Sequence, residues 1–190
     1  MPDGDPVALK KDLTEHFIAG EQVFDGVLLK VFRDRVRLPD GTESGREYIR
    51  HPGAVAIVPL FDDGTILLER QFRYPHRREF IEIPAGKVDP GESHLATARR
   101  ELLEETGYTA AEWMRLGAIH TAIAYTDEAI ELFIARKLTR QAQKLDQGEF
   151  LETFSLPFAE AIRMIGEGAI TDAKTVTALL LVEKRLKPQP

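Results

Sequence analysis

The chain has 190 residues, 43% of them hydrophobic, and a formal net charge of −6 at neutral pH. This length can bury a sizeable core and suggests one domain of ordinary size with a small appendage. The negative net charge argues against a nucleic-acid-binding surface, which would be basic. The absence of cysteine excludes disulfides, thiol catalysis and thiolate zinc sites.

The sequence carries no sign of export or of membrane insertion. The first residues, MPDGDPVALKKDLTEHF, lack the apolar core of a signal peptide. No apolar run reaches the about 18 residues that a membrane-spanning helix needs. We therefore expect a cytoplasmic protein with no membrane partner.

A small antiparallel sheet is expected at the N-terminus, within residues 1–52. Residues 1–18 are polar and are expected to be ordered only in part. Residues 23–38 are rich in β-branched and bulky side chains and end at the turn residues 39–41, Pro-Asp-Gly. Residues 47–49 can form the returning strand.

The remaining residues, 53–190, alternate between strand and helix patterns. AVAIVPLF reads as a buried strand, and Asp-Asp-Gly then turns the chain back into a second strand, as in a hairpin. Ser93 and Gly107 fit the N-cap and the C-terminal glycine of one helix. We expect strands at 54–61, 65–72, 79–86, 116–121, 130–135 and 150–155, and helices at 94–106, 157–168 and 172–186. This order predicts a mixed α/β fold with helices covering a sheet.

Three glutamates gather on one flank of the helix at 94–106. Glu101 and Glu105 lie four residues apart, and Glu104 lies beside them. Like charges at this spacing destabilise an isolated helix by about 0.2–0.5 kcal/mol per pair. Mg²⁺, which prefers carboxylate oxygens, would reverse the sign of that effect. The alternative is a solvated charged face, on which Arg99 and Arg100 soften the repulsion.

The turn before this helix favours the metal site. Gly86, Pro90 and Gly91 form a loop that can fold back over the helix start. A backbone carbonyl near Gly86 can then add another hard oxygen ligand. We also expect Glu92 to pair with Arg100 and so to hold the loop to the helix.

These residues resemble the Nudix box, GX5EX7REUXEEXGU, in which U is an aliphatic residue. Gly86, Glu92 and the run from Arg100 to Gly107 meet the fixed positions, and Tyr108 replaces the last aliphatic residue. The resemblance implies the Nudix fold, a mixed sheet sandwiched between helices, and hydrolysis of a nucleoside diphosphate linked to another group. It also implies a Mg²⁺ cofactor, with Mn²⁺ as the alternative. The implied ligands are Glu101, Glu104, Glu105 and the carbonyl of Ala85, with Glu104 and Glu105 counted as catalytic.

The flanks resemble the branch that cleaves ADP-ribose and other nucleoside diphosphate sugars. HPGAVAIVPL, LLERQFRYP and EFIEIPAGKVDPGE are similar to that branch. The resemblance implies substrate contacts at Arg46, Arg73 and Glu128, and a homodimer that exchanges its N-terminal sheets. The sequence departs from this branch in one respect. ADP-ribose enzymes tend to carry a Pro-Gly pair about 15 residues after the box, and this chain lacks it.

A late loop is expected to hold the general base. Relatives tend to carry a glutamate there, and in this chain the loop contains Asp146, Gln147, Gly148 and Glu149. Because an amide is a poor proton acceptor near neutral pH, Glu149 is the first candidate. Asp146 and Glu152 are the alternatives.

The leading interpretation is a Mg²⁺-dependent pyrophosphatase that converts ADP-ribose, or a similar sugar nucleotide, to a nucleoside monophosphate and a sugar phosphate. One alternative is a nucleoside triphosphate pyrophosphatase of the same fold. Another is a non-catalytic sensor that binds a nucleotide sugar and regulates a partner.

Overall fold

The computed structural model describes residues 11–186 except residues 144, 146, 147 and 149. The chain divides into two compact units. The described part of the first unit consists of residues 11–51 and Ala124–Asp127. The second unit consists of Pro52–Ile123 and the chain from Glu128 onward.

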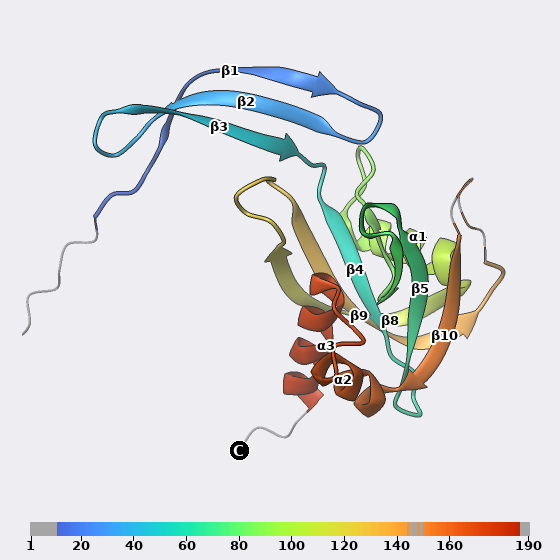
Figure 1. Ribbon diagram of the computed structural model, residues 1–190. Coiled ribbons are helices and arrows are strands. Elements are labelled where there is room, and N and C mark those ends of the chain that lie inside the picture. The colour runs from blue at the N-terminus through green and yellow to red at the C-terminus, as the bar shows by residue number, and fades with distance from the viewer. Residues whose placement is uncertain (1–10, 144, 146–147, 149, 187–190) are drawn as a thin grey trace, which may run out of the picture. The chain divides into compact units, whose positions relative to one another are not determined.

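The first unit is built on a three-stranded antiparallel sheet in the order β1-β2-β3 (Figure 1). The segment 23–38, which the sequence suggested as one strand, contains a turn. The amide of Gly26 donates to the carbonyl of Leu29 at 2.9 Å, so the segment divides into the end of one strand and the whole of the next. Residues 1–18 were expected to be ordered only in part, and within this segment the first strand begins at His16. The strands are β1 His16–Asp25, β2 Lys30–Arg37 and β3 Glu43–Arg50.

The second unit is centred on β4, Ala54–Pro59, which is buried along its whole length. It lies inside a mixed sheet of order β7-β4-β9-β8, in which it runs parallel to β9 and antiparallel to β7. Alternate side chains point to opposite faces of a strand, so both faces of β4 are covered. The other strands are β7 Ala85–Lys87, β8 Tyr108–His120 and β9 Ala129–Arg140.

A second sheet, of order β10-β5-β6, corrects two sequence expectations. The turn at Asp62-Asp63-Gly64 does reverse the chain, but beyond the bridge between Leu60 and Ile66 the two strands join different sheets. The expected strand 79–86 is likewise two strands, because the chain changes sheets at Ile83 and Pro84. The strands are β5 Thr65–Arg73, β6 Arg78–Glu82 and β10 Leu151–Pro157.

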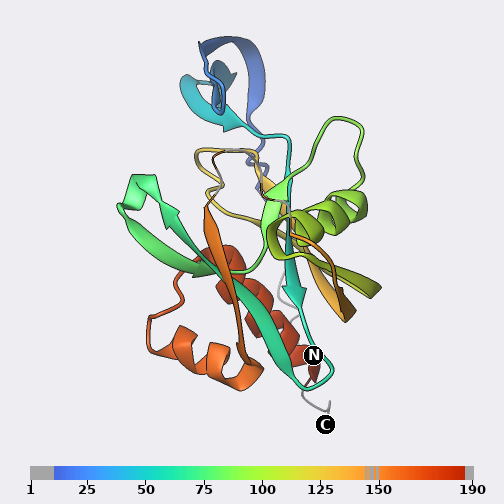
Figure 2. The same ribbon diagram turned by 90° about the vertical axis from the view of Figure 1, so that its right-hand side faces the viewer.

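Helices cover both faces of the β4 sheet (Figures 1 and 2). Val55 and Ile57 pack with Ala98 and Leu102 of α1 on one face. Ala54, Ala56 and Val58 pack with residues of α2 and α3 on the other. The helices are α1 His94–Thr106, α2 Phe158–Gly166 and α3 Ala173–Leu186, and a 3-10 turn spans Tyr74–His76. The expected fold, a mixed sheet between helices with a small N-terminal antiparallel sheet, is confirmed.

Helix α1 begins and ends where its local sequence predicts. The side chain of Ser93 accepts the amide hydrogen of Ala96 at 3.3 Å, and Gly107 takes a left-handed conformation with φ of 70°. Local capping chemistry therefore determines both ends of the helix that carries the glutamates. Among the described residues, no helix has both the length and the apolar character needed to cross a membrane.

Candidate active site

A cavity of about 460 Å³ in the second unit brings together several of the polar residues that the sequence singled out. One wall is acidic and comes from α1, with the start of β7 beside it. Another wall is cationic and comes from the end of β5 and the start of α3. Among the residues that line it are Arg73, Ala85, Gly86, Glu101, Glu104, Glu105, Glu128, Asp172 and Lys174. A larger hollow on the N-terminal sheet, about 670 Å³, is shallow and lacks these residues.

Glu105 is the most buried carboxylate on the acidic wall, with 4% of its surface exposed. Its Oε2 accepts the backbone N–H of Ala85 at 3.0 Å, which joins the end of α1 to the start of β7. Leu102, on the core side of α1, is fully buried against β4 and fixes the rotation of the helix. The same hydrogen bond places Glu105 beside the residue whose carbonyl was expected to bind metal.

Gly86 allows β7 to pass close to Glu101. A Cβ atom at this position would lie 1.9 Å from Cδ of Glu101, which is far inside van der Waals contact. The glycine is therefore required by a close approach between backbone and side chain. This explains in physical terms why the acidic stretch begins with glycine.

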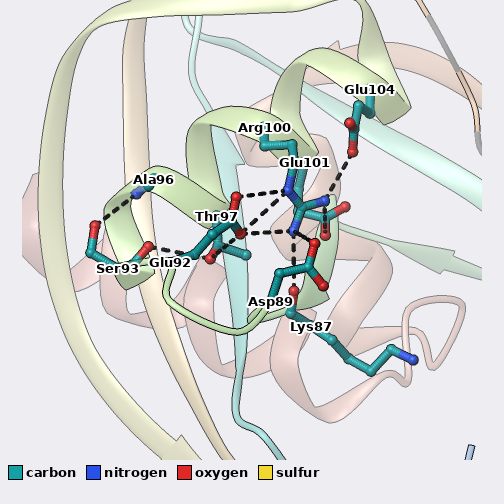
Figure 3. A network of polar contacts seen from close by, with 9 residues as sticks. All are labelled: Lys87, Asp89, Glu92, Ser93, Ala96, Thr97, Arg100, Glu101 and Glu104. Atoms are coloured by element: carbon teal, nitrogen blue, oxygen red, sulfur yellow. Dashed lines mark hydrogen bonds and ion pairs between the residues drawn. The ribbon is translucent and has the colours of Figure 1, made fainter.

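Arg100 lies at the centre of a polar network that joins the loop to α1 (Figure 3). Its Nη1 donates to Glu101 at 2.8 Å and to Glu104 at 2.9 Å. Its Nε and Nη2 donate to Glu92 at 3.1 Å each, so the expected pair of Glu92 and Arg100 is confirmed. Glu92 raises the pKa of Arg100 most, and Glu104 and Glu101 add to this against the opposing effect of burial.

Glu92 has the complementary role on the loop side. The hydrogen bond from Arg100 lowers the pKa of this carboxyl, and a second one from the hydroxyl of Thr97, 2.9 Å long, adds to the effect. Glu92 thus holds the loop against the first turns of α1 through these hydrogen bonds. Glu92 is not among the residues that line the cavity.

The donor set on the acidic wall fits a hard divalent cation. Three carboxylates from one helix flank and the backbone of Ala85 and Gly86 line the same space, and such oxygen ligands suit Mg²⁺ or Mn²⁺. In the arrangement described, no three acidic or imidazole side chains of the described residues converge on one point. Arg100 neutralises part of the carboxylate charge in this arrangement.

Arg73 lies on the cationic wall and is held by Glu82. Nε and Nη2 of Arg73 each donate to one carboxylate oxygen of Glu82 at 2.7 Å, a bidentate pair. Burial alone would raise the pKa of Glu82, but Arg73 and Lys174 outweigh it and lower the pKa. Glu82 in turn raises the pKa of Arg73. Arg73 is therefore a fixed cation at the cavity rather than a mobile surface charge.

Lys174 is a cavity residue that the sequence analysis missed. It is the second residue of α3, it is buried, and it donates to Glu82 and, at 3.0 Å, to Asp172. One signal was available in the sequence, because a lysine two residues after a capping aspartate lies at the positive end of the helix dipole, where a cation is unfavourable. Its partner Glu82 lies far away in the chain and could not have been identified from the local pattern.

The remaining expected site residues have different positions. Glu128 lines the cavity and accepts the hydroxyl hydrogen of Thr121 at 2.6 Å. Arg46 belongs to the first unit, where its Nε donates to Glu15 at 2.8 Å. Glu149 lies outside the described residues, as do Asp146 and Gln147. Glu152 is a β10 residue that pairs with Arg70 of β5.

Comparisons with known proteins identify the family of this chain. A family model described as the NUDIX domain matches residues 50–179. An ADP-ribose pyrophosphatase of Bacillus subtilis (strain 168) is 40% identical over 171 residues, which are 89% of this chain and 92% of that protein. A methanol dehydrogenase activator of Bacillus methanolicus is 40% identical over 177 residues, 91% of this chain and 96% of that protein.

A solved structure gives the same result at the level of the fold. The crystal structure of an ADP compounds hydrolase superposes with a TM-score of 0.84 and 27% sequence identity, covering 93% of this chain and 96% of that one. The family match spans the box residues from Gly86 to Tyr108 and the core sheet. This chain therefore belongs to the Nudix family and is a pyrophosphatase of its ADP-ribose and nucleoside-diphosphate-sugar branch.

Proposed function

We propose that this protein hydrolyses the pyrophosphate bond of ADP-ribose or a similar nucleoside diphosphate sugar, giving a nucleoside monophosphate and a sugar phosphate. The observation that supports the proposal is that one cavity has carboxylates on one wall and fixed cations on another. A substrate diphosphate is anionic, so cations on both sides of it would stabilise its negative charge. The cationic wall provides them on one side, and a metal on the acidic wall would provide them on the other.

Nudix hydrolases generally use a divalent metal, and we propose Mg²⁺ for this chain. Glu101, Glu104, Glu105 and the carbonyl of Ala85 would hold it. A bound divalent ion of this kind polarises phosphoryl oxygens and lowers the pKa of a coordinated water. The chain's own residues then have to orient the diphosphate and to accept a proton.

The contacts of Arg73 and Glu128 support the roles that we propose for them. Arg73, fixed by Glu82, is suited to grip phosphoryl oxygens through its guanidinium. Glu128, fixed by Thr121, is suited to accept hydroxyl hydrogens of a sugar. We assign Glu149 as the proton acceptor, because a carboxylate bound to metal has little basicity left for that task. Arg46 is proposed as a further substrate contact.

A panel of substrates tests the function directly. ADP-ribose, GDP-mannose, ADP-glucose and ATP are incubated with the enzyme and Mg²⁺, and the products are identified by mass spectrometry. We expect the diphosphate sugars to yield a nucleoside monophosphate and a sugar phosphate, and excess chelator to abolish the reaction. Preferred release of pyrophosphate from ATP would support the triphosphate pyrophosphatase instead, and full activity in chelator would contradict the metal site.

The second relative's description favours one alternative, in which the chain acts on another enzyme. The Bacillus methanolicus protein is a methanol dehydrogenase activator and matches nearly the whole chain. If this chain is a non-catalytic sensor that regulates a partner enzyme, it should raise the rate of a methanol dehydrogenase even when the panel shows no hydrolysis. Hydrolysis by the purified protein alone would contradict a purely non-catalytic role.

A further inference from the structure

Two buried glutamates face each other beside the cavity. Glu69 of β5 and Glu82 of β6 are directly opposite in the strand register, with 1% and 2% of their surfaces exposed. Like charges at such positions destabilise a strand pair, and a buried charge is costly unless it is compensated. The residues just before Glu69 on β5 are buried and apolar. A fold that needed only stability would favour apolar side chains here.

The cations that compensate these two carboxylates carry a free-energy cost of their own. Lys174 is buried in the first turn of α3, where the helix dipole disfavours a positive charge. Replacing a buried ion pair with well-packed apolar residues is often neutral or stabilising. Stability alone therefore does not explain why Lys174 and Arg73 both converge on Glu82.

The location of Lys174 and Arg73 explains why both converge on Glu82. Lys174 and Arg73 line the same cavity as the three glutamates of α1, but they come from α3 and β5. An ammonium group has three N–H donors, and the described contacts of Lys174, to Glu82 and Asp172, use two of them. The bidentate pair with Glu82 uses Nε and Nη2 of Arg73. Each cation thus retains donors for a ligand in the cavity.

We propose that Lys174 is a substrate-binding residue that grips the diphosphate from the side opposite α1, together with Arg73. Glu82 is the positioning residue for both cations, and Asp172 anchors Lys174 from the start of α3. The Thr175 hydroxyl supports this arrangement, because it donates to Asp172 at 2.6 Å and accepts the amide hydrogen of Ile83 at 3.0 Å. The inference rests on the proposed function for the identity of the ligand, a nucleoside diphosphate sugar.

The central experiment replaces Lys174 and measures both catalysis and binding. Lys174→Met keeps the length of the side chain and removes its charge, and Lys174→Arg keeps the charge. The matched control is Lys184→Met, which removes an exposed lysine from the same helix. KM and kcat are measured with ADP-ribose, and the affinity for inorganic pyrophosphate is measured by calorimetry in Mg²⁺. Pyrophosphate probes the diphosphate subsite without a nucleoside or a sugar.

We expect Lys174→Met to weaken pyrophosphate binding and to raise KM about 10- to 100-fold, as expected for one charge-assisted hydrogen bond. The kcat should stay within a few fold, Lys174→Arg should recover part of the affinity, and Lys184→Met should match the wild type. Unchanged pyrophosphate affinity and KM in a folded Lys174→Met protein would overturn the proposal. If the wild type hydrolyses no nucleotide sugar, the proposed function fails, but the pyrophosphate measurement still tests Lys174.

A double variant separates binding from folding. Lys174→Met leaves Glu82 with one cation fewer and can destabilise the fold for that reason alone. Lys174→Met combined with Glu82→Gln removes both charges, so the melting temperature should recover relative to the single variant while pyrophosphate binding stays weak. Recovery of both properties in the double variant would show that Lys174 is only a counter-ion for Glu82, which contradicts the proposal.

Discussion

Gly86 allows the backbone of β7 to approach the carboxylate of Glu101, and this contact gives a prediction at the scale of one residue. In Gly86→Ala the new Cβ would lie 1.9 Å from Cδ of Glu101, so the carboxylate has to move. Because the carboxylate is the far end of a flexible side chain, we expect the fold to survive. The activity should fall at least about tenfold, since misplaced catalytic groups lose rate steeply.

Steady-state hydrolysis of ADP-ribose and a thermal melt test this prediction together. The matched control is Gly166→Ala at the end of α2, where no atom lies within 4 Å of the added Cβ. The control should keep wild-type activity. Full activity in Gly86→Ala would mean that the position of the Glu101 carboxylate does not matter for the reaction.

Glu82 gives a prediction about pH at the same scale. Its carboxyl faces Arg73, Lys174, Glu69 and Asp172, and the two cations lower its pKa below the ordinary 4.5 despite burial. A lowered pKa contributes stability that is fully present above the unfolded value and is lost as the pH falls through the folded value. The ionised form of Glu82 therefore stabilises the protein at neutral pH but not in acid.

Urea unfolding of the wild type and of Glu82→Gln, from pH 7 down to pH 3, measures this effect. We expect the wild type to be more stable at pH 7 and the difference to shrink as the pH falls below about 4.5. The control Glu112→Gln, at an exposed position of β8, should show a difference that does not change with pH. A constant difference for Glu82→Gln would contradict the lowered pKa.

Local signals made one part of the site predictable. Glu101, Glu104 and Glu105 lie within five residues of one helix, and caps at Ser93 and Gly107 define that helix. Helix spacing alone therefore placed the carboxylates on one flank. Lys174 could not be found in this way, because its importance depends on Glu82, which lies far away in the sequence and close in the fold.

At the scale of elements, the sequence predicted the types of helix and strand better than their partners. The buried run of β4 was recognised from its apolar residues, yet its parallel pairing with β9 depends on residues that are distant in the chain. The division of the expected strand 79–86 at Ile83 and Pro84 has the same cause. Proline lacks a donor for a continuing ladder, but only the fold shows where the chain is held, by the hydrogen bonds of Ile83 with Thr175 and of Pro84 with Ile57.

The segment between β9 and β10 carries the prediction about the general base. Its first end is tied to the end of α1, because the amide of Gln141 donates to the carbonyl of Gly107 at 2.6 Å and the Gln143 side chain donates to the backbone carbonyl of Glu105. Its second end is β10, where Glu152 pairs with Arg70. Glu152 thus has a structural partner on the sheet, which leaves Glu149 as the better candidate for the proton acceptor.

We expect Glu149→Gln to lower kcat at least about tenfold while KM stays within a few fold, because a general base acts only in the transition state. Glu152→Gln is the matched control from the same segment and should have a smaller effect. Steady-state kinetics on ADP-ribose measures both. A crippled Glu152→Gln with a normal Glu149→Gln would move the base to position 152.

At the scale of the whole molecule, the N-terminal sheet has too little chain to bury its own apolar side chains. Of the described residues in β1, β2 and β3, only Val36 is buried. Phe17, Phe24 and Leu28 each expose more than half of their surface, at 66%, 55% and 66%. Exposed apolar side chains gathered on one small sheet mark an interaction surface. This exposure supports the prediction of a homodimer that forms through residues 1–52.

Light scattering coupled to gel filtration should report a dimer, with twice the 21.4 kDa mass of one chain, at micromolar concentration. Phe24→Asp combined with Leu28→Asp should shift the protein toward the monomer, because a charge in a buried interface is costly unless it is paired. The control Leu180→Asp, at an exposed leucine of α3, should remain a dimer. A wild-type protein that is monomeric at these concentrations would contradict the dimer. A dimer unaffected by the double substitution would place the interface away from these two side chains.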